Sequence, residues 1–146
     1  MSDLELAKAY LLENDLSIVI AKEGDIIAKE KGKGINPLLI IIEKLGYKLK
    51  GASIADKILG KAAAALSLNA GIKYFYGSVV SEKAIEYLIH KKINAENIEA
   101  KTIVPYILNH EQTDMCPLEK LTMGIENVSD MKIVLKDFLS DKSKNV

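Results

Sequence analysis

Two segments of the sequence place polar or reactive side chains where a helix is expected to begin. The first is Ala55 to Lys57, and the second is Asp114 to Glu119, which contains Cys116 and Pro117. The N-terminus of a helix presents free N–H groups and the positive end of the helix dipole, so it favours thiolates and bound anions. We therefore expect the chemistry of this chain at these two helix starts.

Cys116 is the only cysteine in the chain and its best candidate for a nucleophile. The helix that opens at Pro117 and a nearby lysine such as Lys57 would favour its thiolate. Such a thiolate could attack an electrophilic carbon while Glu119 or Asp114 transfers protons. The alternative is that the cysteine is a small buried apolar side chain, which is the usual role of a lone intracellular thiol.

Lys57 and Lys61 are four positions apart, so on one helix they would share a face with Asp56 at the helix start. All 20 basic residues are lysine, so an anion could be bound only by point charges and backbone amides. The pair could bind a phosphate, a carboxylate or a nucleotide, and Gly60 would let a ligand approach closely. The alternative is a solvated lysine pair beside a capping aspartate.

Neither histidine predicts a metal site. His90 lies beside two lysines near an expected helix end, where a solvated cation is favourable. His110 precedes Asp114 and Cys116, but the spacing of the three matches no standard zinc site. The glycines form neither a phosphate-binding loop nor a dinucleotide fingerprint. We expect no metal and no cofactor.

The composition limits the class of protein. The 146 residues suit one domain, and 20 basic against 20 acidic side chains disfavour a nucleic-acid partner. The densest apolar run, Leu38 to Ile42, is five residues long, whereas a membrane span needs about 20. Acidic residues near Met1 argue against a signal peptide, and a single cysteine suits a reducing compartment. We expect a cytoplasmic protein with no membrane partner, for which a homo-oligomer remains open.

The first third of the chain predicts a helix, a hairpin and a second helix. Asp3 to Glu13 has helical apolar spacing after a possible cap at Ser2. Two β-rich runs, Ser17 to Lys22 and Asp25 to Lys31, flank Glu23-Gly24, which suits a tight antiparallel hairpin. Pro37 to Leu45 follows a possible cap at Asn36 and precedes Gly46, which predicts a short buried helix.

The remainder predicts strands that alternate with helices. We expect a long helix from Ser53 to about Asn69, a helix after Ser81, one opening at Cys116-Pro117, and a last one over Val128 to Leu139. Strands are expected at Ile72 to Val80 and Ile98 to Val104, and the tail Asp141 to Val146 is expected to be disordered. This order predicts one α/β domain, a three-layer α/β/α sandwich with a mixed sheet of four or five strands.

Three stretches carry a resemblance to a known family: Gly34 to Leu39, Ala55 to Ala64, and Asp114 to Glu119. They resemble the prokaryotic domain-of-unknown-function family 1893 over roughly Leu4 to Leu121. The resemblance implies a cytidine deaminase-like fold with no assigned activity. Its motif positions in this chain would be Asp56, Lys57, Gly60, Lys61, Asp114, Cys116, Pro117 and Glu119.

The zinc chemistry of the deaminase fold is not expected here. Those enzymes place a His-x-Glu or Cys-x-Glu at one helix start and a Pro-Cys-x-x-Cys at another. Ala55 to Lys57 contains no histidine, cysteine or glutamate, and the second segment keeps only Cys116, with its proline after it. A catalytic zinc needs three protein ligands, so deamination by that mechanism is not predicted.

Three functions stay open. The first is a metal-independent enzyme acting on a small anionic or nucleotide-like metabolite, with Cys116, Lys57, Asp56 and Glu119 as catalytic residues and Lys61, Gly60, Asp114 and Pro117 binding the ligand. The second is a sensor or binding domain that uses the same pocket without turnover. The third is an interaction module in which these residues only stabilise helix starts.

Overall fold

One five-stranded sheet organises the chain, and its strands run in the order β2-β1-β3-β4-β5. The computed structural model describes residues 1–109 and 111–144, and side chains as far as residue 138. The strands are β1 (Ile18–Lys22), β2 (Asp25–Glu30), β3 (Ser53–Leu59), β4 (Tyr74–Ser81) and β5 (Ile98–Val104). The helices are α1 (Asp3–Glu13), α2 (Asn36–Leu45), α3 (Lys61–Asn69), α4 (Glu82–His90), α5 (Pro117–Thr122) and α6 (Val128–Lys144).

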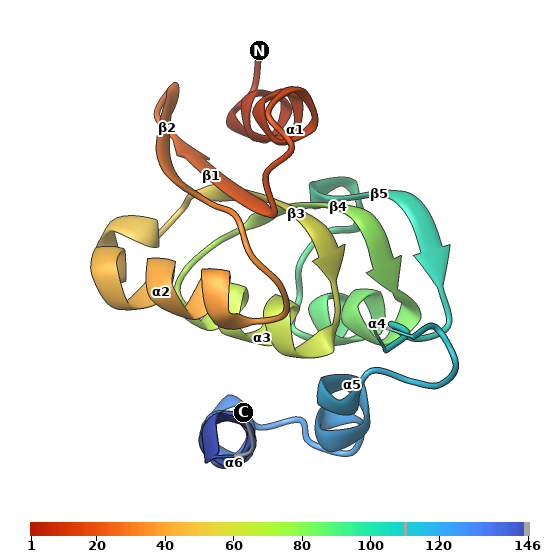
Figure 1. Ribbon diagram of the computed structural model, residues 1–146. Coiled ribbons are helices and arrows are strands. Elements are labelled where there is room, and N and C mark those ends of the chain that lie inside the picture. Colours follow the sequence, from red (N-terminus) through yellow and green to blue (C-terminus); the bar gives the residue numbers. More distant parts are fainter. Residues whose placement is uncertain (110, 145–146) are drawn as a thin grey trace.

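The sheet is mixed, as the sequence predicts. Strand β1 pairs antiparallel with both β2 and β3, while β3, β4 and β5 run parallel. Helices α3 and α4 make the two crossovers between the parallel strands. Helix α1 lies on one face of the sheet, and α2, α3 and α4 lie on the other (Figure 1). The carboxyl ends of β3 and β4 therefore lead directly into the starts of α3 and α4.

The predicted N-terminal helix and hairpin are confirmed. The Ser2 hydroxyl caps α1 by accepting a hydrogen bond from the Glu5 backbone N–H at 3.1 Å. Glu23 and Gly24 both have positive φ, as a two-residue hairpin turn requires. The Asp3 carboxylate accepts from the backbone N–H groups of these two turn residues, each at 2.9 Å. The turn is thereby tied to the first residue of α1.

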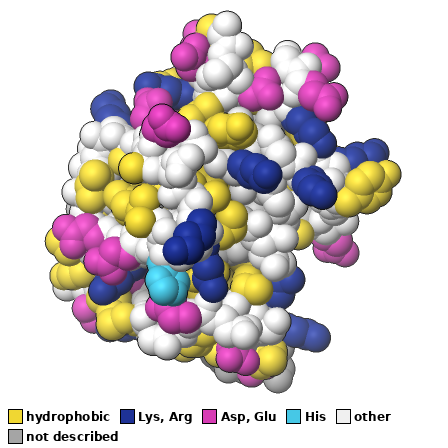
Figure 2. Space-filling model, turned by 180° about the vertical axis from the view of Figure 1, so that it is seen from behind, with side chains coloured by type: hydrophobic (Ala, Val, Ile, Leu, Met, Phe, Trp, Pro, Cys, Tyr) yellow, Lys and Arg dark blue, Asp and Glu magenta, His cyan; other side chains and the backbone are white. Residues whose placement is uncertain are grey.

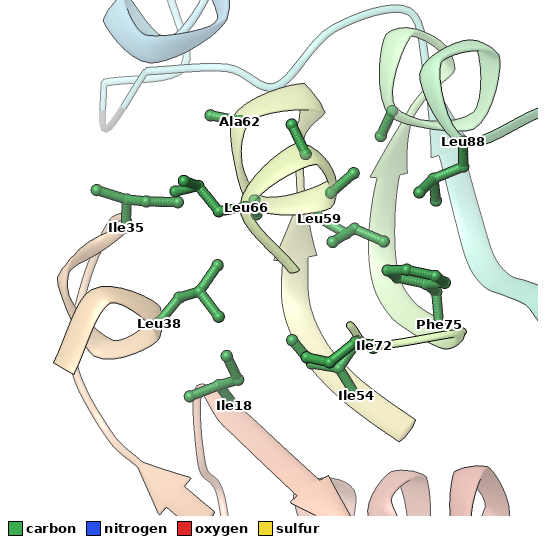
Figure 3. Close-up of a cluster of buried hydrophobic side chains, with 14 of the residues drawn as sticks. Ile18, Ile35, Leu38, Ile54, Leu59, Ala62, Leu66, Ile72, Phe75 and Leu88 are labelled. Atoms are coloured by element: carbon green, nitrogen blue, oxygen red, sulfur yellow. The ribbon is translucent and has the colours of Figure 1, made fainter. Parts of the chain in front are cut away.

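Apolar side chains form a core on each face of the sheet. The smaller one packs α1 against the sheet through Ala7, Leu11, Val19 and Tyr76. In the larger one, side chains from the sheet meet side chains from α2, α3 and α4 (Figure 3). The labelled members from strands include Ile18, Ile54 and Phe75, and those from helices include Leu38, Leu66 and Leu88.

The expected long helix from Ser53 to Asn69 is wrong in its first half. Ser53–Leu59 is β3, the central strand of the sheet, and α3 begins only at Lys61. Alanine, lysine and leucine favour a helix locally, which is why the segment resembles one. Pairing on both sides and burial of Ile54 and Ala55 on opposite faces override that preference.

Smaller departures occur at the ends of two other helices. Ile35, and not Asn36, is the cap residue of α2, and no side-chain hydrogen bond caps that helix. The end at Gly46 is as predicted. The backbone of α6 is helical to Lys144, so part of the tail expected to be disordered is helical, while residues 145–146 lie outside the described residues. In the part of the chain that the structure describes, no helix is both long and apolar enough to cross a membrane.

Gly77 supplies a test of this packing. A Cβ atom there would overlap Cγ2 of Val80 and lie 3.1 Å from Cβ of Leu59. We expect Gly77→Ala to lower the free energy of unfolding by about 1–3 kcal/mol, measured by urea denaturation, because the crowded side chains must move. Gly124→Ala is the control, since nothing lies within 4 Å of its Cβ position. An equal loss in both variants would contradict the packing described for β4.

Candidate functional site

The structure does not bring Lys57 and Cys116 together. Lys57 follows Ala55 by two positions on β3, so it faces the side of the sheet that α1 covers. Its ammonium lies 2.8 Å from the carboxylate of Asp15, just after α1. Cys116 precedes α5, which contacts α3 on the other side of the sheet (Figure 1). The prediction that they face a common cavity is wrong, and so is the prediction that Lys57 and Lys61 share a helix face.

Asp56 lies on β3 and faces the larger core, opposite Ile18 on β1 and Gly77 on β4. Its carboxylate accepts a hydrogen bond from the Ile58 backbone N–H at 3.1 Å. Burial raises the pKa of Asp56 to about 7, and this hydrogen bond opposes the rise. No cation pairs with it among residues 1–109 and 111–138. Asp56 is therefore a half-buried acid in a strand and does not cap a helix.

Glu119 joins the starts of α3 and α4. Its side chain is buried, and Oε1 accepts a hydrogen bond from the Lys61 backbone N–H at 3.0 Å and contacts the Ser81 hydroxyl at 3.3 Å. The Ser81 hydroxyl also accepts from the Ala84 backbone N–H at 3.1 Å, which caps α4 as predicted. The carboxylate replaces the side-chain cap that Gly60 cannot give to α3.

Gly60 is the residue before α3 and makes room for this carboxylate. A Cβ atom at Gly60 would overlap Oε1 of Glu119 and lie 3.3 Å from Cγ1 of Ile107. Gly60, Lys61 and Glu119 are three predicted site residues that the structure does bring together. They meet because α5 docks on the start of α3, whereas the sequence analysis expected Gly60 inside a helix.

The Lys61 side chain is only 4% exposed, although it carries an ammonium group. Its Nζ donates to the Met123 carbonyl at 3.2 Å and to the Glu126 carboxylate at 3.1 Å. An ammonium has three N–H donors, and these two acceptors are its only partners in the described part of the chain. The Glu126 side chain is 62% exposed, so its carboxylate can turn from Lys61 into solvent without becoming a buried charge.

The buried lysine lines a polar hollow of about 360 Å³ between α4 and the segment that joins α5 to α6. Its lining residues are Lys61, Lys83, Glu86, Tyr87, His90, Met123 and Glu126. Figure 2 shows a histidine with lysine and acidic side chains beside it on the rear face. Burial raises the pKa of the Tyr87 hydroxyl, and the nearby Glu126 carboxylate adds to the rise. We call these seven residues the Lys61 pocket.

Cys116 is the residue before α5, and it is half-exposed. The Cys116 backbone N–H donates to the Ile107 carbonyl at 2.6 Å, and no described side chain hydrogen-bonds its sulfur. Pro117 opens α5 as predicted, but this helix has only six residues. Asp114 is exposed and paired with Lys120; this hydrogen bond and one from the Met115 N–H lower its pKa. Lys57, the cation expected beside this thiol, pairs with Asp15 instead.

Other candidate sites are weaker. An apolar hollow of about 340 Å³ lies between α2, α3 and α6, with few polar groups to orient a ligand. His110 lies outside the described residues. Among the side chains that the structure describes, in residues 1–109 and 111–138, no three of histidine, cysteine, aspartate or glutamate are grouped as a metal site would need.

The sequence analysis missed five residues of the Lys61 pocket: Lys83, Glu86, Tyr87, Met123 and Glu126. Lys83, Glu86 and His90 recur at helical spacing on α4, a signal that could have placed them on one face. His90 was expected to be a solvated cation, and it is exposed, but it also lines the pocket. Glu126 follows a short turn, and no local pattern connects it to Lys61.

Comparison with known proteins bears on the family and the fold. Residues 6–139 match the family described as Domain of unknown function (DUF1893). The chain is similar to the crystal structure of a DUF1893 family protein from Thermotoga maritima, with a TM-score of 0.80 and 24% identity over 88% of this chain and 85% of that one. At this identity the likeness concerns the fold alone. A search of curated proteins finds no match. Since the family match spans most of the sequence, the chain belongs to the DUF1893 family, as its motifs indicate.

Proposed function

We propose that this protein is a binding domain for a small anionic metabolite, which it holds in the Lys61 pocket without chemical turnover. The observation that carries the proposal is the Lys61 ammonium, which is buried but opens on a polar hollow. A buried charge is costly unless it is paired. Here one partner is a neutral carbonyl and the other is the exposed Glu126 carboxylate.

A phosphate or carboxylate group could take the place of Glu126. Both bring the negative charge that the ammonium needs, and a lysine pairs with either as a point charge. Lys83 and His90 also line the pocket, and Lys83 adds positive charge. Lys83 pairs with Glu86 at 3.4 Å, and both of these side chains are exposed. Exposed pairs of this kind contribute little, so a ligand anion can recruit Lys83 at small cost.

This proposal is favoured over the enzyme with a cysteine nucleophile. That hypothesis needs a cation beside Cys116 and a proton acceptor within reach of its sulfur. Lys57 pairs with Asp15, and Lys120 pairs with Asp114. Glu119 accepts hydrogen bonds from Lys61 and Ser81 instead.

We also propose that the sheet belongs to the cytidine deaminase-like three-layer class and that the protein works in the cytoplasm. The first proposal is supported by the mixed five-stranded sheet with α1 on one face and α2, α3 and α4 on the other. The second is supported by the single cysteine.

The binding proposal is tested by calorimetric titration with inorganic phosphate and with AMP. We expect saturable binding of at least one of them to the parent protein. We expect that binding to fall at least tenfold in Lys61→Met, because the methionine keeps the apolar stem and loses the charge. Lys57→Met is the matched control, since Lys57 lies outside the pocket. Equal affinity in Lys61→Met and Lys57→Met would refute the proposed site.

Glu126→Gln should act in the opposite direction. The amide removes the anion that competes for Lys61 while keeping the size of the side chain. We expect the same probe to bind about two- to fivefold more tightly, because a partly exposed ion pair contributes about 0.2–1 kcal/mol. Glu96→Gln, an exposed glutamate outside the pocket, is the control for net charge. Weaker binding in Glu126→Gln alone would mean that the ligand does not replace this carboxylate.

A further inference from the structure

We propose that two copies of this chain pair through the outer edge of β5, antiparallel, so that their sheets join into one. Strand β5 lies at the end of the sheet and pairs with β4 on one side only. In the described part of the chain no strand pairs with its other side. A seven-residue edge strand with no proline or glycine presents a row of free N–H and C=O groups that another strand can pair with.

The two edges of the sheet differ in how they are protected. At the other edge, the pairing of β2 with β1 is interrupted by a register shift between Ile20 and Ala21. Glu30 at the end of β2 also forms an ion pair with Lys44 of α2. Bulges and nearby helices discourage strand addition. The pairing of β5 with β4 has no register shift, and although Glu99 pairs with Lys8 of α1, Lys101, Thr102 and Ile103 of β5 are exposed.

The charges of β5 select one register. A two-fold axis perpendicular to the sheet keeps the helix-covered faces of both copies on the same side. Residues that lie opposite each other share a face, so the axis must pass midway between the two copies of one residue. Centred on Ala100, it places Glu99 opposite the partner's Lys101 and Lys101 opposite the partner's Glu99. Centred on Glu99 or on Lys101, it places like charges directly opposite each other. The sequence Glu99-Ala100-Lys101 is thus complementary to itself in one arrangement.

The neighbouring helix leaves room for this pairing. Helix α1 contacts β1, β2, β3 and β4 on its face of the sheet and leaves β5 open (Figure 1). Lys8 of α1 reaches the edge only through its side chain, which pairs with Glu99. In the dimer Glu99 would lie between Lys8 and the partner's Lys101. Both cations then stabilise the same carboxylate.

Exchanging the charges at Glu99 and Lys101 and measuring the mass of each variant by sedimentation tests the proposed dimer. The parent should sediment as a dimer of about twice the 16.0 kDa chain mass. Glu99→Lys and Lys101→Glu should each shift the population towards the monomer, because each sets like charges opposite each other in the Ala100 register. The double variant with both exchanges should restore the dimer in part, because the pairs across the axis are again of opposite charge while Lys8 then faces a lysine at position 99. A monomeric parent at every concentration, or a dimer indifferent to the single exchanges, would overturn the proposal.

A cysteine cross-link tests the register. In a Cys116→Ser background, Ala100→Cys puts two introduced thiols across the axis, with Cα atoms about 4.5–5.5 Å apart, within reach of a disulfide. We expect a covalent dimer under mild oxidation. Thr102→Cys is the matched control, since its two thiols would lie about 13 Å apart along the strands. Cross-linking of Thr102→Cys but not of Ala100→Cys would overturn the register.

Discussion

Gly60→Ala is expected to lower the free energy of unfolding by about 2–4 kcal/mol, one of the largest effects of a single methyl group in this chain. The added Cβ would overlap Oε1 of Glu119. Moving that carboxylate breaks its hydrogen bond from the Lys61 backbone and its contact with Ser81. Overpacking costs about 1–3 kcal/mol, and a buried polar group left without its partner costs a similar amount.

The double variant Gly60→Ala/Glu119→Ala separates this clash from other effects of alanine. Without the carboxylate, the closest remaining neighbour of the methyl group is Cγ1 of Ile107 at 3.3 Å, so the cost of Gly60→Ala should fall below about 1 kcal/mol in the Glu119→Ala background. Urea denaturation of the four proteins gives this coupling directly. If the two single variants lower the free energy of unfolding by amounts that simply add in the double variant, the Glu119 carboxylate does not lie against Gly60 at the start of α3.

Asp56→Asn is expected to stabilise the protein at about pH 8 by about 1–2 kcal/mol and to change its stability little at about pH 4. Burial raises the pKa of Asp56 from 3.8 to about 7. Between these values the folded state holds a proton that the unfolded state has released. Unfolding then releases a proton, so the stability of the parent falls as the pH rises from about 4 to about 7. The full shift would correspond to about 4 kcal/mol, and partial exposure reduces it.

Asp15→Asn is the control, because the stability that Asp15 contributes should depend on pH in the opposite direction. The hydrogen bond and charge of Lys57 hold the pKa of Asp15 below its usual value, so its contribution is present near neutral pH and is lost as the pH falls. Thermal unfolding of the three proteins between about pH 4 and pH 8 measures both effects. If the parent and Asp56→Asn have the same pH profile, the Asp56 carboxyl is not desolvated as described.

Local signals in the sequence predicted most of the elements. The Ser2 and Ser81 caps, the Glu23-Gly24 turn and the proline that opens α5 are each decided by a few neighbouring residues. The central strand β3 was missed because its residues favour a helix in isolation. Only pairing with β1 and β4, which are distant in the sequence, makes it a strand.

The site was predicted only in part, for the same reason. Lys61, Gly60 and Glu119 were selected from motif positions, and they do meet. Lys57 and Asp56 were placed with them because the segment was read as one helix, and the strand turns Lys57 to the other face. Glu126 lies 65 positions from Lys61, so only the docking of α5 and the following turn reveals the pair.

The most direct test of anion binding is NMR of the lysine side-chain ends in protein labelled with ¹³C at Cε and ¹⁵N at Nζ. The Lys61 signal is assigned by its loss in Lys61→Met. On addition of inorganic phosphate, or of AMP if phosphate does not bind, this signal should move and saturate while the signal of Lys57 stays in place, because Lys61 lines the pocket and Lys57 does not. A Lys61 signal that does not respond to either probe, or that moves no more than the signal of Lys57, would contradict the proposed function.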